Sequence, residues 1–163
     1  MTFAPASLAL ATQVLDACQA RGLRLATAES CTGGLIAACL TEIAGSSAVV
    51  ERGYVTYDIR AKQEMLGVPA DLLERVGAVS EEVALAMAAG ARERAGVDLA
   101  VAVTGIAGPG GATATKPVGL VHIALAAANA PLRHERHLLT GDRSAVRRAS
   151  LDAALALILR SVA

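Results

Sequence analysis

Short apolar segments in this chain end in polar or glycine-rich motifs, and this arrangement constrains the possible fold more than any other feature. The apolar run that begins at Leu23 leads into A-E-S-C-T-G-G, residues 28–34. The apolar run over residues 97–103 leads into T-G-I-A-G-P-G-G, residues 104–111. Open α/β proteins bind ligands in the loops that follow the carboxyl ends of strands. The sequence therefore predicts an α/β fold whose functional residues lie at strand ends.

Hydrophobic spacing and stop signals divide the chain into alternating helices and strands. Helices are expected over residues 5–20, 32–44, 60–66 and 81–95, and from the cap Asp142 to about residue 160. Strands are expected over residues 23–28, 49–57, 97–103, 118–127 and 133–139. This alternation favours a three-layer α/β/α sandwich. The last strands follow one another without a helix, so we expect a hairpin there and a mixed, mostly parallel sheet of about five strands.

Length and composition limit the possible function classes. The 163 residues suit one domain, 1–163, with a core of its own. A net charge of zero and an aromatic content of 2% argue against a nucleic-acid surface. We expect no membrane span, because no apolar stretch reaches the ~20 residues that one needs, and we expect no signal peptide. The odd count of three cysteines predicts reduced thiols and a cytoplasmic protein.

The A-E-S-C-T-G-G motif lies at a predicted strand-to-helix turn, where backbone N–H groups can hold an anion or an oxyanion. Gly33 and Gly34 let the backbone approach a ligand closely. Ser30 and Thr32 are candidate binding residues, and both also fit the role of a helix N-cap. Cys31 fits either a thiolate nucleophile near a helix N-terminus or a small buried side chain.

Ser47, Tyr57 and Lys62 form a second candidate group, because serine, lysine and tyrosine together can perform acyl transfer without histidine. A desolvated, neutral lysine removes the serine proton, and the tyrosine hydroxyl assists. A surface lysine and a capping serine are the plainer interpretation of the same residues. Thr104 ends a predicted buried strand and is placed to face a cleft. The glycine-rich segment that starts at Gly105 resembles a phosphate loop in composition but lacks the Walker pattern.

Seven short segments follow one another in a specific order between Ala28 and Arg148. They read A-E-S-C-T-G-G, G-S-S, G-Y-V-T-Y-D-I-R-A-K-Q-E-M-L-G-V, G-A-V-S, V-T-G-I-A-G-P-G-G, K-P-V-G and T-G-D-R-x-x-V-R-R. In this order they resemble the CinA carboxy-terminal-domain family, whose characterised members are nicotinamide-nucleotide amidohydrolases. The chain resembles the stand-alone form, without the amino-terminal molybdopterin-binding-like domain that some members carry.

The resemblance implies hydrolysis of the carboxamide of nicotinamide mononucleotide to nicotinic acid mononucleotide and ammonia, in pyridine nucleotide salvage. It implies no metal or other cofactor and a serine–lysine acyl-enzyme mechanism in a homodimer. By motif, Ser47 is the preferred nucleophile, Lys62 the base and Tyr57 the assisting hydroxyl, while Ser30 is the rival nucleophile. Amides near Gly33 and Gly34, or that of Gly105, would hold the oxyanion or the phosphate. The implied substrate-binding residues are Ser30, Thr32, Gly33, Gly34, Thr104, Gly105 and Arg143.

The segment before Lys62 departs from the family pattern. The family usually has Tyr-Ser-Asn ahead of Ala-Lys, whereas this chain has Tyr57-Asp58-Ile59-Arg60. A carboxylate that points at Lys62 would favour the protonated lysine, which opposes general-base catalysis. The alternative function is therefore a catalytically silent nucleotide- or protein-binding module linked to competence or DNA damage. A third hypothesis is a thiol enzyme that uses Cys31 as its nucleophile.

Overall fold

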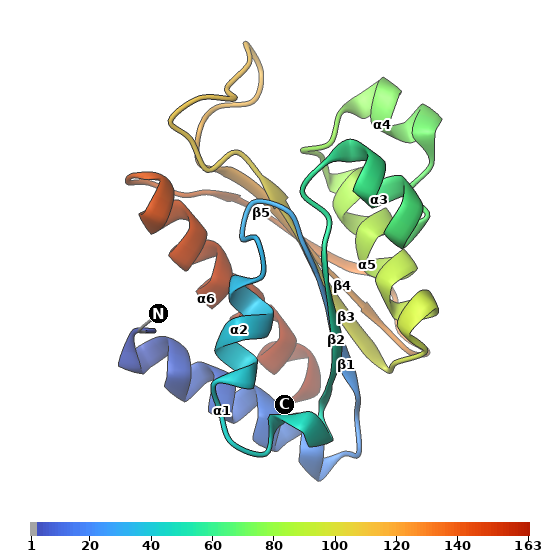
Figure 1. The fold of residues 1–163 in the computed structure, drawn as a ribbon, viewed down its shortest axis with the longest axis vertical. Helices are drawn as coiled ribbons and strands as arrows, with labels where there is room; N and C mark the ends of the chain where they lie inside the picture. The colour runs from blue at the N-terminus through green and yellow to red at the C-terminus, as the bar shows by residue number, and fades with distance from the viewer. Residues whose placement is uncertain (1–2) are drawn as a thin grey trace.

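A five-stranded sheet lies between two layers of helices in the computed structural model, which describes residues 3–163 (Figure 1). The strands are β1 (Leu25–Glu29), β2 (Val50–Val55), β3 (Leu99–Gly105), β4 (Leu120–Ala127) and β5 (Arg133–Leu138). The helices are α1 (Pro5–Ala20), α2 (Leu35–Thr41), α3 (Ile59–Leu66), α4 (Ala70–Val76), α5 (Glu81–Ala95) and α6 (Arg143–Val162), with a 3₁₀ turn η1 (Ser46–Ala48) before β2. None of the helices within residues 3–163 is long and apolar enough to cross a membrane.

The strand order β2-β1-β3-β4-β5 brings the ends of three parallel strands together. β1 pairs in parallel with β2 and with β3, whereas β4 runs antiparallel to both β3 and β5. Four of the five strands therefore run in one direction, and the predicted mixed, mostly parallel sheet is confirmed. The carboxyl ends of β1, β2 and β3 share one edge of the sheet, which is where such folds place their ligand sites.

The two faces of the sheet carry side chains of different size. Large side chains such as Leu25, Val101 and Ile123 belong to the core shared with α1, α2 and α6. The opposite face is built from alanines such as Ala102 and Ala124, which pack with α5. Figure 1 shows the two helical layers, with α1, α2 and α6 on one side and α3, α4 and α5 on the other. Alternation of side chains along each strand produces this division.

Small residues also bring α3 against α5. A Cβ atom on Gly90 of α5 would lie only 1.9 Å from the carbonyl oxygen of Leu66, the last residue of α3. Leu66 is itself part of the core that α5 shares with the alanine face of the sheet. This contact anchors α3, the helix that carries Lys62, to the rest of the fold.

Three local features differ from the sequence predictions. The second helix starts at Leu35 rather than at residue 32, because Gly33 and Gly34 adopt left-handed φ angles of 60° and 97° and form a turn. The short helix α4 was not predicted, although Pro69 just before it is a typical helix-start signal. Residues 46–48 form the 3₁₀ turn η1 where a loop was expected.

Candidate active site

The segments that follow β1, β2 and β3 line an open cleft of about 250 Å³ at the carboxyl edge of the sheet. Ser30 follows β1, Lys62 lies on α3 after β2, and Thr104 is near the end of β3. Arg143, the first residue of α6, also lines the cleft, and much of the remaining wall comes from residues 105–111. The topology thus gathers residues that are far apart in the sequence.

Lys62 and Ser30 make the central contact of this cleft. Lys62 Nζ lies 3.0 Å from Ser30 Oγ, 2.7 Å from the carbonyl oxygen of Thr56 and 3.3 Å from that of Tyr57. The lysine is 1% exposed. In the neutral amine, two N–H bonds can go to the two carbonyl oxygens, which leaves the lone pair for the serine hydroxyl. The arrangement therefore suits a lysine that accepts a proton from Ser30.

Burial lowers the pKa of Lys62 from its ordinary 10.5 to about 8, because removal from water disfavours the charged form. Cys31 and Asp58 act in the opposite direction but do not outweigh burial. Asp58 itself is exposed and accepts a hydrogen bond of 2.8 Å from the N–H of Arg60, so it caps the start of α3. The unusual aspartate therefore has a structural role, and a sizeable fraction of Lys62 is neutral near pH 8.

Glu29 is a fully buried carboxylate that was not among the predicted site residues. Its acceptor contacts are with the N–H groups of Gly34 (3.0 Å), Ile36 (3.1 Å) and Ala37 (2.9 Å) and with Thr27 Oγ1 (3.2 Å). It thus stabilises the start of α2, in place of the N-caps expected from Ser30 or Thr32. A carboxylate inside an apolar run, just ahead of a glycine turn, is the sequence signal that could have identified it.

The amides of Gly33 and Gly34 are already engaged within the protein. The N–H of Gly33 donates to the carbonyl of Ser30 at 3.0 Å, and that of Gly34 donates to Glu29. Neither glycine lines the cleft. The structure therefore does not support the expectation that these two amides hold an oxyanion or a phosphate.

The amide of Gly105 is better placed. The next amide, that of Ile106, donates to Leu120 on the β4 side at 2.9 Å. Because successive amides of a strand point to opposite sides, the Gly105 N–H is directed toward β1. On that side, the N–H of Ser30 donates to the carbonyl of Val103 at 3.0 Å, so Ser30 follows directly beside β3. Gly105 thus presents a backbone donor on the Ser30 side of the cleft.

Tyr57 and Arg143 meet at the rim of the cleft. Arg143 Nη2 donates to the Tyr57 hydroxyl and Nη1 to the carbonyl of Gly108, each at 2.9 Å. Tyr57 contacts Lys62 through its carbonyl, while its side chain is 61% exposed. The tyrosine hydroxyl thus contacts arginine instead of the expected lysine. Thr104 lines the cleft, and its hydroxyl donates to the carbonyl of Ala78 at 2.8 Å.

Besides Gly33 and Gly34, two more predicted site residues lie outside the cleft. Ser47 is exposed on η1, which precedes β2, whereas Lys62 follows the other end of that strand. The structure therefore does not bring Ser47 to Lys62. Thr32 is fully buried, and its Oγ1 has no hydrogen-bond partner among residues 3–163. No group of three or more His, Cys, Asp or Glu side chains in the part of the chain that the structure describes is arranged to hold a metal ion.

Cys31 lines the cleft beside Ser30, but it is a poor thiolate candidate. The residue is only 5% exposed. Burial raises its pKa to about 11, since a charged sulfur would lose its solvation there. The buried-side-chain interpretation of Cys31 therefore agrees with its surroundings. All three cysteines of the chain are free and buried.

Comparisons with known proteins agree with this fold. The CinA C-terminal domain matches residues 7–162. A CinA-like protein of Akkermansia muciniphila is 53% identical over 156 residues, which are 96% of this chain and 38% of the relative. Another CinA-like protein, of Mycolicibacterium vanbaalenii, is 55% identical over 141 residues, 86% of this chain and 33% of the relative. The chain thus spans about a third of the length of these curated relatives.

Solved structures of similar length match almost the whole chain. The crystal structure of competence/damage inducible protein CihA from Agrobacterium tumefaciens has a TM-score of 0.94 at 50% identity and covers 98% of both chains. A CinA superfamily protein from Klebsiella pneumoniae has a TM-score of 0.92 at 38% identity, over 96% of this chain and 97% of its own. This chain belongs to the family defined by the CinA C-terminal domain.

Proposed function

We propose that residues 1–163 form one amidohydrolase domain that converts nicotinamide mononucleotide and water to nicotinic acid mononucleotide and ammonia. The observation that carries this proposal is the 3.0 Å contact between Ser30 Oγ and Lys62 Nζ in a buried setting. A serine beside a lysine with a lowered pKa is a nucleophile with its base. Ser30, rather than the expected Ser47, is therefore the proposed nucleophile.

Acylation begins when neutral Lys62 takes the hydroxyl proton of Ser30 and Oγ attacks the carboxamide carbon. The carbonyls of Thr56 and Tyr57 hold the amine and stabilise the ammonium that forms. The negative oxygen of the tetrahedral intermediate accepts a hydrogen bond from the N–H of Gly105. The carbon–nitrogen bond then breaks, and Lys62 returns the proton to the leaving nitrogen, which departs as ammonia. The product on the enzyme is a Ser30 ester of the nicotinic acid moiety.

Deacylation repeats the same proton movements with water. Lys62 accepts a proton from water while the hydroxide oxygen attacks the ester carbon. The ester bond breaks, Ser30 Oγ regains the proton from Lys62, and the carboxylic acid product leaves. One water is consumed and one ammonia released per turnover, so lysine and serine end as they began.

Arg143 and the glycine-rich segment 105–111 fit the recognition of a nucleotide phosphate. The Arg143 guanidinium lies at the open rim, where it now contacts Gly108 and Tyr57. Guanidinium groups bind phosphate with two parallel hydrogen bonds. We place the pyridine carboxamide near Ser30 and the 5′-phosphate toward Arg143. The three free cysteines fit a reducing, cytoplasmic setting for this reaction, and we expect a homodimer.

The test is ammonia release from nicotinamide mononucleotide by the purified protein without added metal, with Ser30→Ala as the matched variant. Release that disappears in Ser30→Ala supports the proposal. Release that persists in this variant contradicts the role of Ser30, and loss upon alkylation of wild type would then favour Cys31. A folded protein that binds the nucleotide without releasing ammonia would be the silent binding module, the alternative function.

A further inference from the structure

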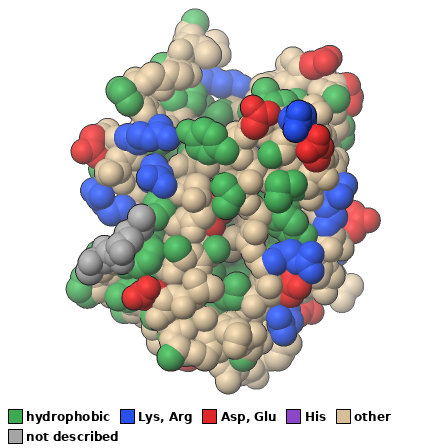
Figure 2. Space-filling view, viewed as in Figure 1, with side chains coloured by type: hydrophobic (Ala, Val, Ile, Leu, Met, Phe, Trp, Pro, Cys, Tyr) green, Lys and Arg blue, Asp and Glu red, His purple; other side chains and the backbone are tan. Residues whose placement is uncertain are grey.

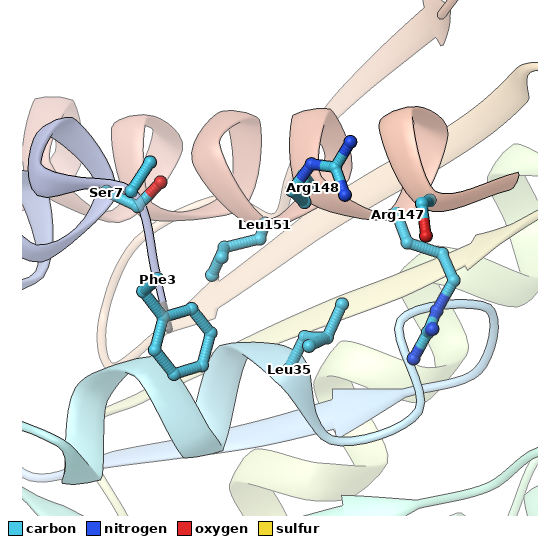
Figure 3. Close-up of a pocket in the computed structure, with 8 residues that line it drawn as sticks. Phe3, Ser7, Leu35, Arg147, Arg148 and Leu151 are labelled. Carbon is cyan, nitrogen blue, oxygen red and sulfur yellow. The ribbon is translucent and has the colours of Figure 1, made fainter. Parts of the chain in front are cut away.

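We propose that Arg147 is a positioning residue that holds the nucleophile turn, residues 30–34, in the geometry that Ser30 needs for attack. The proposal rests on the function proposed for Ser30. Arg147 Nε donates to the carbonyl of Cys31 at 3.1 Å, and Nη2 donates to the carbonyl of Thr32 at 2.9 Å. Figure 3 shows the side chain reaching from its helix, α6, toward the turn that follows β1. One guanidinium thus binds the two carbonyls directly after the nucleophile.

Glu29 stabilises the same turn through its N–H groups, whereas Arg147 binds its carbonyl groups. That carboxylate accepts N–H groups from Gly34 and from the first turn of α2. Arg147 supplies donors to carbonyls, and Glu29 supplies acceptors to amides. Both contacts are charge-assisted, which makes them about twice as strong as neutral hydrogen bonds. A turn with two left-handed glycines is intrinsically adaptable, so these two side chains determine its conformation.

A hydrogen-bonded chain connects Arg147 to the nucleophile residue itself. Arg147 donates to the carbonyl of Thr32, which shares a peptide group with the N–H of Gly33. That N–H donates to the carbonyl of Ser30 at 3.0 Å. Donation to a peptide carbonyl polarises the peptide and strengthens the bond that its N–H makes. Removal of the guanidinium therefore weakens the bond that closes the turn on Ser30.

Two arginines of α6 contact different parts of the site. Arg143 and Arg147 lie one helical turn apart and reach the cleft rim and the nucleophile turn respectively. Figure 2 shows Lys and Arg side chains gathered over the start of α6. Arg148 is the next residue and has the same charge, but its side chain is exposed and makes no hydrogen bond or ion pair within residues 3–163. It provides a matched control for loss of charge alone.

A cavity of about 190 Å³ borders Arg147 between α1, α2 and α6. Its floor is apolar, with Phe3, Leu35 and Leu151 facing it (Figure 3). A small planar cation could enter through this space once the arginine side chain is shortened. The cavity thus makes chemical rescue of a truncated Arg147 a practical test.

The experiment compares Arg147→Ala with Arg148→Ala in steady-state kinetics on nicotinamide mononucleotide. We expect kcat of Arg147→Ala to fall on the order of 10²-fold, because a displaced nucleophile loses its attack geometry, while KM and the apparent pKa of the pH profile stay unchanged. Arg148→Ala should retain the wild-type kcat. Guanidinium or ethylguanidinium, below unfolding concentrations, should restore part of the activity of Arg147→Ala and leave Arg148→Ala unaffected. Wild-type kcat in a folded Arg147→Ala variant would overturn the proposal.

A second readout does not depend on the reaction. Amide hydrogen exchange in residues 30–37 should become faster in Arg147→Ala and remain at the wild-type rate in Arg148→Ala, while α5 and β3 stay protected in both. Equal exchange in the two variants would show that Arg147 does not hold the turn. If the wild type releases no ammonia but the exchange difference appears, the proposed function has failed and the positioning contact has not.

Discussion

Hydroxyl side chains flank both ends of β2, Ser46 and Ser47 before the strand and Thr56 and Tyr57 after it, yet only the second end contributes to the cleft. Ser47 lies on the exposed turn η1 before the strand, and Lys62 follows its carboxyl end. A six-residue strand is roughly 20 Å long, so one strand separates these two residues. Ser30 comes from the neighbouring strand and lies 32 positions from Lys62 in the sequence, but 3.0 Å from it in space.

Strand direction, rather than closeness along the chain, determines which residues meet in the cleft. Parallel neighbours place their carboxyl ends at the same edge, so β1, β2 and β3 present Ser30, Lys62 and Thr104 together. Residues at opposite ends of one strand can never converge in this way. In a parallel sheet, candidate partners should therefore be sought at the ends of adjacent strands.

Substitution of the two serines tests this difference most directly. Ser30→Ala should lower kcat on the order of 10⁴-fold or more, because it removes the nucleophile. Ser47→Ala should keep wild-type ammonia release, since its side chain is exposed at the far end of β2. Initial rates of ammonia release, with circular dichroism as a check of folding, measure both. The opposite ranking of the two variants would invert the comparison and return the role of nucleophile to Ser47.

Much of the fold could be predicted because the relevant signals are local. All five strands were predicted, and the cap Asp142 stands just ahead of α6, as expected. The turn at Gly33 and Gly34 was less predictable, because Glu29 caps α2 from outside the helix. Such a contact depends on how β1 enters the helix, and spacing of residues does not reveal that.

Most residues of the site could be predicted from the sequence, but which serine contacts Lys62 could not. Lys62, Thr104 and Arg143 were named from motifs, and all three line the cleft. The choice between Ser30 and Ser47 required the strand order, which a linear pattern does not contain. The contact of Arg147 with the turn at residues 30–34 could not be predicted, because it depends on the packing of α6 beside α2, two helices far apart in the sequence.

The two lysines of the chain provide the next comparison. Lys62→Ala should lower kcat by about 10²–10⁴-fold, because general-base catalysis contributes that much. Lys116 reaches the carbonyl of Val76 at 2.6 Å and does not line the cleft, so Lys116→Ala is the matched control. Single-turnover and steady-state rates of both variants measure the effect. A Lys62→Ala variant with a substantial fraction of wild-type activity would exclude lysine as the base.

The pH dependence of turnover sharpens the contrast between a buried lysine and an exposed one. Only neutral Lys62 accepts the proton of Ser30, and its pKa is about 8. Below that value kcat/KM should therefore rise about tenfold per pH unit and then level off above it. An exposed lysine would shift the plateau toward pH 10.5, its ordinary pKa. Rates across pH 6–10 in buffers of constant ionic strength distinguish the two, and a flat profile would contradict both.

The smallest expected effect is on stability, and it isolates the cost of burying Lys62. Its folded pKa of about 8 lies below the unfolded value near 10.5, so between these values the unfolded chain binds more protons and stability rises with pH. The favourable contribution is complete above the unfolded pKa and is lost as pH falls through the folded one. Lys62→Met should therefore be more stable than wild type at pH 7, on the order of 1 kcal/mol, and this advantage should shrink by pH 10.

The buried cysteines make the comparison with Lys62→Met necessary. Their pKa values are raised to about 11 from 9.0, so in wild type and variant alike they lower stability as pH rises between these values. The difference in unfolding free energy between the two proteins largely cancels this shared contribution and leaves that of Lys62. Urea unfolding at pH 7, 8.5 and 10 measures it. A stability advantage of Lys62→Met that stays constant with pH would mean that Lys62 has the same pKa in the folded and unfolded chain. Burial would then not lower the pKa of Lys62, which contradicts its proposed role as the base.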